Sequence, residues 1–276
     1  MGRELKELRS IISKVLQPIT ETKKSQNAEN INNNFSHKLD IRSISAVPTK
    51  EIPDRTTTEQ LPMSCAEAMP DGSKKSGIYK IYLPESDLKP FYVYCQSDPD
   101  NSTAWTVVQR REDSRVNFFA DWKTYKAGFG NLNGAFFIGL DKLHALTQSE
   151  LHELWIRLED FEGETRYAKY DLFAIGDEST QYTLSILGKY SGNAGDSFSS
   201  HQGQKFSTKN VDNDITSKNC AERYKSSWWN FDCYDSNLNG EYGSGYKNYT
   251  GINWKTWHGI EYSLKGAIMA IRPSKS

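Results

Sequence analysis

Hydrophobic and polar residues alternate along several short segments after residue 64, and this period of two is typical of half-buried strands. We expect strands over residues 77–83, 91–95, 105–109, 154–158, 182–187 and 267–271. Helical spacing predicts short helices over residues 120–127 and 140–147, the first ending at Gly128 and the second beginning at Asp141. The chain after residue 64 therefore combines short strands with short helices.

The beginning of the chain has a different pattern, with hydrophobic residues at the a and d positions of a heptad. They are Leu5, Leu8, Ile12, Val15 and Ile19. Pro18 lacks the amide that a helix interior requires, so the predicted helix covers about residues 3–16. This helix is either a short coiled coil that oligomerises the chain or a single amphipathic helix.

Aromatic residues divide the chain into two parts. Residues 1–64 contain one aromatic side chain, Phe35, whereas all Trp, Tyr and Cys residues come later. Residues 20–64 are rich in Asn, Thr, Ser, Lys and Glu, which bury too little apolar surface to offset the entropy of ordering. We therefore predict a tail over residues 1–61, made of the helix and a flexible linker, and a folded domain over residues 62–276.

Residues 188–255 show little periodicity and are rich in Gly, Asn, Ser, Asp and aromatic residues. A stretch of this length without regular structure is uncommon in a compact domain unless something else orders it. A cysteine pair and the carboxylates of Asp212 and Asp214 are the two candidates. Because long ordered loops commonly carry binding sites, we place the function in residues 188–262, the binding region.

Overall charge limits the class of partner. The 276 residues contain 34 Lys and Arg against 35 Asp and Glu, for a net charge of −1. Such a chain has no long-range field that attracts nucleic acid or an anionic membrane, and no apolar segment is long enough to span a bilayer. We therefore exclude nucleic-acid binding and membrane insertion.

Four cysteines form two sequence-local pairs. They are Cys65, Cys95, Cys220 and Cys233. Neither pair has CxxC spacing, so disulfides in an oxidising compartment are favoured over a metal site, with four buried free thiols as the alternative. Three N-x-S/T sequons, at Asn34, Asn101 and Asn248, agree with secretion as a glycoprotein.

The N-terminus does not fit secretion. Residues 1–10 contain five charges, whereas a secretory signal needs an apolar segment of about 7–15 residues. Either the export signal is missing from this version of the chain, or the protein is cytosolic with reduced cysteines.

Catalytic motifs are incomplete in this chain. His152 and Glu153 begin an HExxH motif, but Ile156 occupies the position of its second histidine. Ser200 and His201 are neighbours in sequence, and we expect them on a surface loop because triad residues are defined by spatial geometry. No GxSxG, P-loop or complete GxGxxG motif is present, so we expect no enzyme.

Asp212-Asn213-Asp214 is the best candidate for a cation site. Two carboxylates in a loop can bind one hard cation, with backbone carbonyls and waters completing about six to eight oxygens. The positions that follow lack the Gly and Glu of an EF-hand. The same D-x-D pattern occurs in solvated turns and, in glycosyltransferases, holds a metal-bound nucleotide.

Several motifs occur in the order and spacing of one protein family. They are residues 105–111 (WTVVQRR), 118–130 (FFADWKTYKAGFG), 212–214 (DND), 219–221 (NCA), 228–229 (WW), 237–240 (NLNG) and 251–254 (GINW). Together they resemble the signature of fibrinogen-related domains over about residues 62–273. The chain is most similar to ficolins, tachylectins and secreted fibrinogen-like proteins of invertebrates.

The resemblance implies an α+β fold, a fibrinogen C-terminal-like globular domain with a central antiparallel sheet, short helices and a long loop-rich subdomain for calcium and ligand. The implied disulfides are Cys65–Cys95 and Cys220–Cys233. The implied calcium ligands are the side chains of Asp212 and Asp214 and the backbone carbonyls of Thr216 and Lys218. Two carboxylates with neutral oxygens bind calcium at about 10⁻⁴–10⁻³ M, which suits extracellular fluid.

Acetyl-binding members of the family have a cis peptide bond before the last cysteine, which corresponds to Asp232–Cys233. Their two backbone amides at this bond point at the acetyl oxygen, and an aromatic funnel packs the methyl group. Tyr224 matches one aromatic wall. Fibrinogen's own knob-peptide pocket has an acidic residue there, so we do not expect binding of a knob peptide.

Three positions depart from that funnel. Tyr234 replaces the usual His, Asn248 replaces a Tyr with Tyr249 beside it, and Ile260 replaces an aromatic residue with Tyr262 nearby. A glycan on Asn248 would crowd the mouth of the pocket, and we expect Tyr262 to pack structurally. The candidate ligand-binding residues are Tyr224, Asp232, Cys233, Tyr234, Asn248 and Tyr249.

The resemblance implies a secreted, calcium-dependent pattern-recognition lectin of innate defence that binds acetylated glycans such as N-acetylglucosamine. The alternative is an extracellular adhesion or signalling module that binds a cell-surface protein, with calcium purely structural. An open cleft around Tyr224, Tyr234 and Tyr249 would favour the lectin, and a filled one the alternative. Because the implied disulfides use all four cysteines, any homo-oligomer would be noncovalent.

Overall fold

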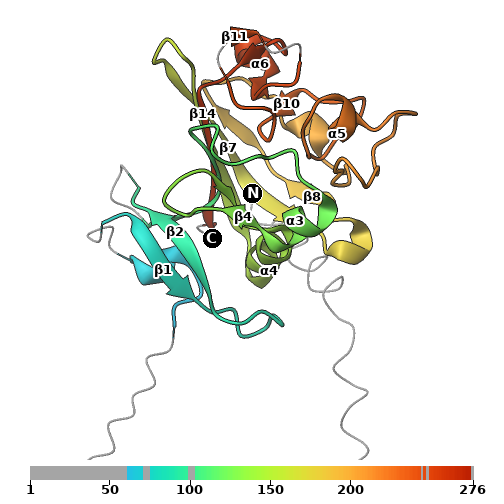
Figure 1. The fold of residues 1–276 in the computed structure, drawn as a ribbon. Helices are drawn as coiled ribbons and strands as arrows, with labels where there is room; N and C mark the ends of the chain where they lie inside the picture. The colour runs from blue at the N-terminus through green and yellow to red at the C-terminus, as the bar shows by residue number, and fades with distance from the viewer. Residues whose placement is uncertain (1–60, 71–74, 99–102, 244, 247–248, 275–276) are drawn as a thin grey trace, which may run out of the picture. The chain divides into compact units, whose positions relative to one another are not determined.

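The computed structural model describes residues 61–70, 75–98, 103–243, 245–246 and 249–274 (Figure 1). The predicted helix over residues 3–16, the linker up to residue 60 and the asparagines of the three sequons lie outside these residues. The boundary between tail and domain at residue 62 stays a prediction. No helix in the described part of the chain is long and apolar enough to cross a bilayer.

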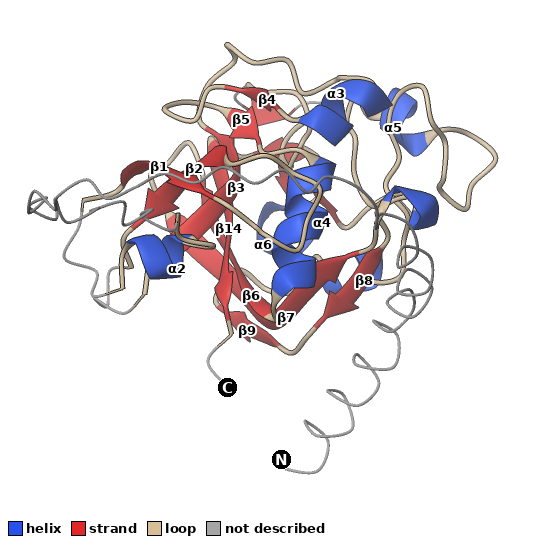
Figure 2. Cartoon of the chain, turned by 90° about the horizontal axis from the view of Figure 1, so that it is seen from below, coloured by secondary structure: helices blue, strands red, loops and turns tan. Residues whose placement is uncertain are grey.

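One antiparallel sheet forms the centre of the domain (Figure 2). Its main path runs β1 (Gly77–Ile81), β2 (Phe91–Gln96), β3 (Trp105–Arg111), β14 (Gly266–Pro273), β6 (His152–Glu159), β7 (Thr165–Ile175) and β8 (Leu184–Leu187). Three shorter strands attach to it, β4 (Phe129–Gly130), β5 (Phe136–Phe137) and β9 (Tyr190–Gly192). The last strand along the chain lies in the middle and pairs with both β3 and β6.

The strands expected from alternation are present, but β7 was not predicted. Ala168 and Tyr170 are buried, and the next buried residues on this strand are Phe173 and Ile175. The pairing of β6 with β7 shifts register at this point. A β-bulge changes which face later side chains occupy, so it hides the period of two in the sequence.

Several element boundaries differ from the prediction by two residues, and two of these differences have a clear local cause. β8 begins at Leu184 because Gln181 and Tyr182 have φ angles of 54° and 48°, in the left-handed region. The first predicted helix is α3 (Trp122–Ala127), which begins after Asp121 because its carboxylate caps the Thr124 N–H at 2.9 Å. It ends, as predicted, at Gly128.

The second predicted helix is α4 (Leu140–Ser149), and its expected start at Asp141 was wrong. Gly139 is the N-cap, with no side-chain hydrogen bond at the cap. Asp141 lies in the first turn instead, where its carboxylate accepts a hydrogen bond from the Tyr182 hydroxyl. The acid therefore ties the helix to the segment before β8.

The core lies along the central strands and beneath α4, and its side chains include Val107 on β3, Leu143 on α4, Ile156 on β6 and Met269 on β14, all buried. At the sheet edge α2 (Cys65–Ala68) is joined to β2 by the disulfide Cys65–Cys95, the pairing that the resemblance implied.

The described residues of the binding region form short elements, as expected. They are η2 (Ser199–His201), α5 (Cys220–Arg223), β10 (Ser236–Asn237), β11 (Gly245–Tyr246), β12 (Asn253–Trp254), α6 (Lys255–His258) and β13 (Tyr262–Ser263), preceded by η1 (Glu178–Thr180). Figure 1 shows α5, α6, β10 and β11 gathered at one end of the domain, away from β1 and β2.

Candidate functional site

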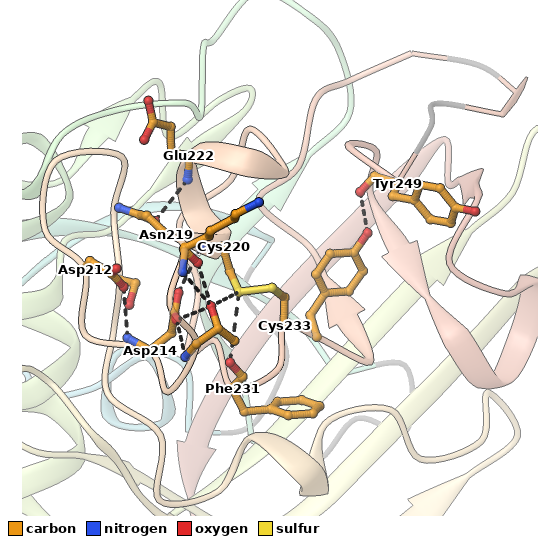
Figure 3. Close-up of a disulfide and its surroundings, with 12 residues drawn as sticks. Asp212, Asp214, Asn219, Cys220, Glu222, Phe231, Cys233 and Tyr249 are labelled. Atoms are coloured by element: carbon orange, nitrogen blue, oxygen red, sulfur yellow. Dashed lines mark hydrogen bonds between the residues drawn. A yellow bond between two sulfur atoms is a disulfide. The ribbon is translucent and has the colours of Figure 1, made fainter.

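The carboxylate motif lies on the loop before α5 (Figure 3). The Asn213 side chain donates to the Phe206 carbonyl at 2.8 Å, and its backbone N–H donates to Ser207 Oγ at 3.0 Å. Both Phe206 and Ser207 are buried. The middle residue of the motif is therefore anchored to the domain interior, while Asp212 is exposed and Asp214 half-buried.

Asp214 organises the loop that follows it. Its Oδ1 accepts from the Thr216 N–H at 2.9 Å, and its Oδ2 accepts from the Cys220 N–H at 2.8 Å. Asp212 Oδ1 accepts from the Asp214 N–H at 3.3 Å. The Thr216 hydroxyl donates to the Lys218 carbonyl at 2.6 Å. The four residues predicted to bind calcium thus lie on one small hydrogen-bonded loop.

The two aspartates repel each other. Burial and the charge of Asp214 raise the pKa of Asp212. Among the described residues no group donates a hydrogen bond to Asp212 Oδ2 or to the Thr216 carbonyl, and no three or more His, Cys, Asp or Glu side chains are grouped so that they could hold a metal ion. An all-oxygen donor set with two carboxylates fits a hard cation such as Ca²⁺ better than a transition metal.

One disulfide connects this loop to the other side of the site. Asn219 caps α5, with its Oδ1 accepting from the Glu222 N–H at 3.1 Å. Cys220, the first residue of α5, is bonded to Cys233, as the resemblance implied. In Figure 3 the aspartates lie to one side of this disulfide and Tyr249 to the other.

A cleft of about 590 Å³ opens beside Cys233. It is lined by Arg223, Tyr224, Asp232, Cys233, Tyr234, Tyr249 and Ile260. The structure therefore brings the predicted ligand-binding residues together, except for Asn248, which lies outside the described residues. The cleft is open, and an open cleft around these tyrosines is the feature that we expected of a lectin.

Two tyrosines form one wall of the cleft. The rings of Tyr224 and Tyr234 meet edge to face, with centroids 5.1 Å apart. Tyr234 is buried, and its hydroxyl donates to the Tyr249 carbonyl. Burial raises the pKa of Tyr234, which keeps the hydroxyl protonated as a donor.

Tyr249 forms a second wall and is held at both ends. Its φ of 74° lies in the left-handed region, which is unusual for a bulky side chain. Its carbonyl accepts from Tyr234, and its hydroxyl donates to Glu261 Oε1 at 2.5 Å. Tyr249 is 38% exposed, so part of the residue stays accessible to a ligand.

The peptide bond between Asp232 and Cys233 is cis. The Cys233 carbonyl accepts from the Phe231 N–H at 2.9 Å. Within the described part of the chain, the N–H groups of Asp232 and Cys233 donate no hydrogen bond. Two backbone donors on residues that line the cleft therefore have no acceptor in the described part of the chain.

His201 is buried, so its expected place on a surface loop was wrong. Its Nδ1 lies 2.7 Å from the Trp229 carbonyl, and its Nε2 accepts from the N–H groups of Asp235 and Ser236, each at 3.2 Å. The hydroxyl of Ser200 donates to Asp235 at 2.9 Å. His201 therefore joins three segments of the binding region and forms no catalytic pair with its neighbour.

Tyr262 packs structurally, as expected, whereas two other residues of the site were not named from the sequence. Tyr262 stacks on His258 with ring centroids 4.4 Å apart and donates to Glu162, away from the cleft lining. Arg223 and Glu261 were not predicted. Arg223 could have been found from its position next to Tyr224, whereas no sequence pattern marks the contact of Glu261 with the tyrosine.

Comparison with known proteins identifies the domain. Residues 61–274 match the family model described as the fibrinogen beta and gamma chains, C-terminal globular domain. The chain belongs to this fibrinogen C-terminal domain family. Its members are binding domains and not enzymes.

Relatives agree with this assignment. The chain is 42% identical over 221 residues to Fibrinogen C domain-containing protein 1-A of Xenopus laevis, covering 78% of this chain and 48% of that protein. It is 43% identical over 216 residues to the human Fibrinogen C domain-containing protein 1, covering 76% and 46%. The chain thus spans about half the length of these relatives.

Solved structures give the same fold. The fibrinogen-like globe domain of human ANGPTL2 matches with a TM-score of 0.74 and 39% identity, covering 78% of this chain and all of that one. A lamprey fibrin D-dimer complexed with the peptide Gly-His-Arg-Pro-amide matches with a TM-score of 0.72 and 30% identity, covering 100% of this chain and 85% of that one.

Proposed function

We propose that this fibrinogen C-terminal domain is a secreted, calcium-dependent lectin that binds acetylated sugars such as N-acetylglucosamine on microbial or cell surfaces. The observation that carries the proposal is the open cleft of about 590 Å³ beside the Asp232–Cys233 peptide bond. A site for a small ligand combines apolar walls with a few polar groups that fix its orientation. This cleft has both.

Each part of an acetyl group has a counterpart in the cleft. The carbonyl oxygen would accept hydrogen bonds from the N–H groups of Asp232 and Cys233, which have no acceptor among the described residues. The methyl group would pack against the ring of Tyr224 and the side chain of Ile260. A free amine or hydroxyl in place of the acetyl group would leave both contacts unmade.

Calcium would be held by the carboxylates of Asp212 and Asp214 and the carbonyls of Thr216 and Lys218. In the chain itself, Asp214 accepts from the Cys220 N–H, and Cys220 is bonded to Cys233 at the cleft. Neutralising the two carboxylates would therefore stabilise the loop that the disulfide joins to the N–H groups of Asp232 and Cys233. Calcium would supply the positive charge that offsets the repulsion between the two aspartates.

Two disulfides and a low-affinity calcium site suit an extracellular domain. All four cysteines of the chain are paired, so an oligomer would be noncovalent. Oligomerisation through the predicted helix over residues 3–16 would raise the avidity of a shallow site without new contacts. The nearer likeness to ficolins and tachylectins, and glycosylation at the three sequons, stay predictions.

The test is retention of the disulfide-bonded protein on an N-acetylated matrix, compared with the same matrix after deacetylation, with calcium and with a chelator. We expect retention that needs both the acetyl groups and calcium, and that is lost in Asp212→Asn/Asp214→Asn. The matched control is Glu85→Gln/Asp87→Asn, which also neutralises two acids two residues apart, both of them exposed, on the segment between β1 and β2. No retention of the calcium-loaded protein would contradict the proposal and favour a protein receptor.

A further inference from the structure

A second hollow lies between the β4–β5 hairpin and the first turn of α4, and we call it the hairpin hollow. Its volume is about 210 Å³, and it shares no lining residue with the cleft. Four aromatic side chains line it, Tyr92, Phe129, Phe136 and Phe137, together with one charged side chain, Lys142. Apolar walls around a single charge are the usual composition of a site for a small ligand.

The walls of the hollow are fixed by the surrounding backbone. The buried Arg110 guanidinium donates to the carbonyls of Leu132 at 2.9 Å and Gly134 at 3.3 Å, on the turn between β4 and β5. Gly130 has a φ of 94°, and a Cβ added there would lie 2.4 Å from the Ala135 carbonyl oxygen. Because only glycine permits this approach, the two strands hold one arrangement, and the hollow exists before a ligand arrives.

The ammonium group of Lys142 is held in place but keeps a donor. Lys142 is half-buried, and its Nζ donates to the Ala127 carbonyl at 2.7 Å and to the Ile138 carbonyl at 3.2 Å. An ammonium group has three N–H donors, so one remains for another acceptor. Within the described part of the chain, no carboxylate lies within ion-pair distance of Lys142.

The charge of Lys142 is only partly compensated. Its neighbour Asp141 accepts from the Tyr182 hydroxyl and lies 4.0 Å from Lys126 Nζ. Burial lowers the pKa of Lys142, and the charge of Asp141 opposes this effect only in part. A cation that has lost part of its hydration gains from an anion that reaches it.

We infer that the hairpin hollow binds a small aromatic carboxylic acid, with its carboxylate on Lys142 and its ring among Phe129, Phe136 and Phe137. A cavity of about 150 Å³ holds one benzene ring. A hollow of about 210 Å³ therefore has room for a ring with a short acid group. Rings around the ligand favour an aromatic acid over an aliphatic one, because aromatic pairs add to the apolar contact.

The chemistry of the hollow also sets the charge of the ligand. One ammonium group matches the single charge of a carboxylate better than the nearly doubled charge of a phosphate group. The inference goes beyond the proposed function and does not depend on it, because the two sites have no residue in common.

The experiment titrates the full chain with three probes: phenylacetate, phenylacetamide and hexanoate. Phenylacetamide keeps the ring without the charge, and hexanoate keeps the charge without the ring. Binding is followed by the backbone amide NMR signals of Gly130 and Ile138, which line the hollow, and of Cys233, which lines the cleft. The signals report both whether a probe binds and at which site.

Two variants test the residues. Lys142→Gln removes the ammonium group, and Leu132→Trp fills the hollow from its half-buried wall while leaving the lysine in place. The control is Lys123→Gln, which removes an exposed lysine from the first turn of α3, away from the lining of the hollow.

We expect wild type to bind phenylacetate with a dissociation constant of about 1 mM, usual for a ligand of about ten non-hydrogen atoms. Phenylacetamide and hexanoate should each bind roughly tenfold more weakly. Lys142→Gln should lose roughly tenfold in affinity for phenylacetate and nothing for phenylacetamide. Leu132→Trp should bind none of the three, and the control should match wild type.

Equal binding of phenylacetate and phenylacetamide by wild type, or no binding of either, would overturn the inference without any variant. Hexanoate binding as tight as that of phenylacetate would overturn the aromatic assignment. Phenylacetate binding that moves the Cys233 signal and leaves Gly130 and Ile138 in place would overturn the site. Retention of Leu132→Trp on an acetylated matrix should equal that of wild type, which separates this inference from the proposed function.

Discussion

The central sheet and the binding region are ordered by different interactions. The sheet is held by backbone ladders between long neighbouring strands and by a buried apolar face. In the binding region, side-chain amides donate many of the hydrogen bonds that backbone N–H groups of a neighbouring strand donate in the sheet. Five asparagine side chains donate to backbone carbonyls at 2.8–3.2 Å: Asn213 to Phe206, Asn219 to Thr208, Asn237 to Gly251, Asn239 to Ser227, and Asn253 to Tyr262.

This difference explains how a region without periodicity is ordered. Backbone carbonyls in a buried loop must find donors, and Asn supplies two from one short side chain. Asn237, Asn239 and Asn253 are buried, which is uncommon for this residue type. The polar composition of this region is typical of a flexible loop, yet here the polar side chains order the loop by hydrogen-bonding to its backbone.

The largest effect should come from His201, whose ring serves a carbonyl and two N–H groups. His201→Leu fills a similar volume but leaves a carbonyl and two N–H groups of the backbone without partners, so we expect the free energy of unfolding to fall by about 4 kcal/mol or more. Ile156→Val, the control in the sheet, should cost about 1 kcal/mol. Denaturant unfolding measures both, and a smaller loss for His201→Leu than for the control would refute the comparison.

The pH dependence of stability should follow from buried histidines in both regions. Burial lowers the pKa of His201 in the binding region and of His152 in β6 to about 4 each, below the value of 6.5 for a free side chain. The unfolded state therefore binds more protons between these values. Stability should be complete above pH 6.5 and fall toward pH 4, by up to about 3 kcal/mol per histidine. A flat profile across this window would contradict the assignment.

The two disulfides should separate stability from binding. Removing either one by Cys→Ser substitution of both partners should cost about 3 kcal/mol, from the loop-closure entropy of the unfolded chain. Loss of Cys220–Cys233 should also abolish retention on an acetylated matrix, because this bond joins the calcium loop to the cleft. Loss of Cys65–Cys95 at the sheet edge should preserve retention, and equal loss in both variants would show that they act through unfolding alone.

Calcium should stabilise the protein by a smaller amount. At about 10 mM calcium and the affinity expected of two carboxylates, the gain in unfolding free energy is about 1.4 to 2.7 kcal/mol. Asp212→Asn should lose this gain, yet in a chelator it should be no less stable than wild type, since it removes repulsion with Asp214. Glu85→Gln is the control that keeps the gain. A calcium gain that survives in Asp212→Asn would place the ion elsewhere.

The smallest effect should be at Glu261, which holds the Tyr249 hydroxyl. Glu261→Gln weakens a charge-assisted hydrogen bond, so the affinity for N-acetylglucosamine should fall about fivefold with little change in unfolding free energy. Glu164→Gln, on the exposed turn between β6 and β7, is a matched control. Titration followed by tyrosine fluorescence measures the change, and unchanged affinity would show that Tyr249 needs no support from the acid.

The sequence predicted those parts of the sheet and helices that depend on neighbouring residues in the chain. Alternation located most strands, and Gly128 located the end of α3, whereas the start that Asp141 predicted for α4 was wrong. It did not reveal β7, because a bulge interrupts the alternation of Ala168 and Tyr170 with Phe173 and Ile175. Strand order was also hidden, since β14 is the last strand and pairs in the middle of the sheet.

The grouping of residues along the cleft was predictable through motifs and not through periodicity. The resemblance named Tyr224, Asp232 and Cys233, which the structure places on one cleft. It could not reveal that His201 is buried or that Glu261 contacts Tyr249, because both depend on contacts between segments far apart in sequence. A polar residue in an aperiodic stretch does not show from sequence whether it faces water or a backbone carbonyl.

The most direct test of the central claim is the backbone amide NMR signal of Asp232 and Cys233 in calcium-loaded protein during titration with N-acetylglucosamine. The account predicts that both signals shift downfield and saturate together, and that glucosamine, which lacks the acetyl group, moves neither. Saturable binding of N-acetylglucosamine that leaves both signals in place would contradict the claim that these two amides receive the acetyl oxygen.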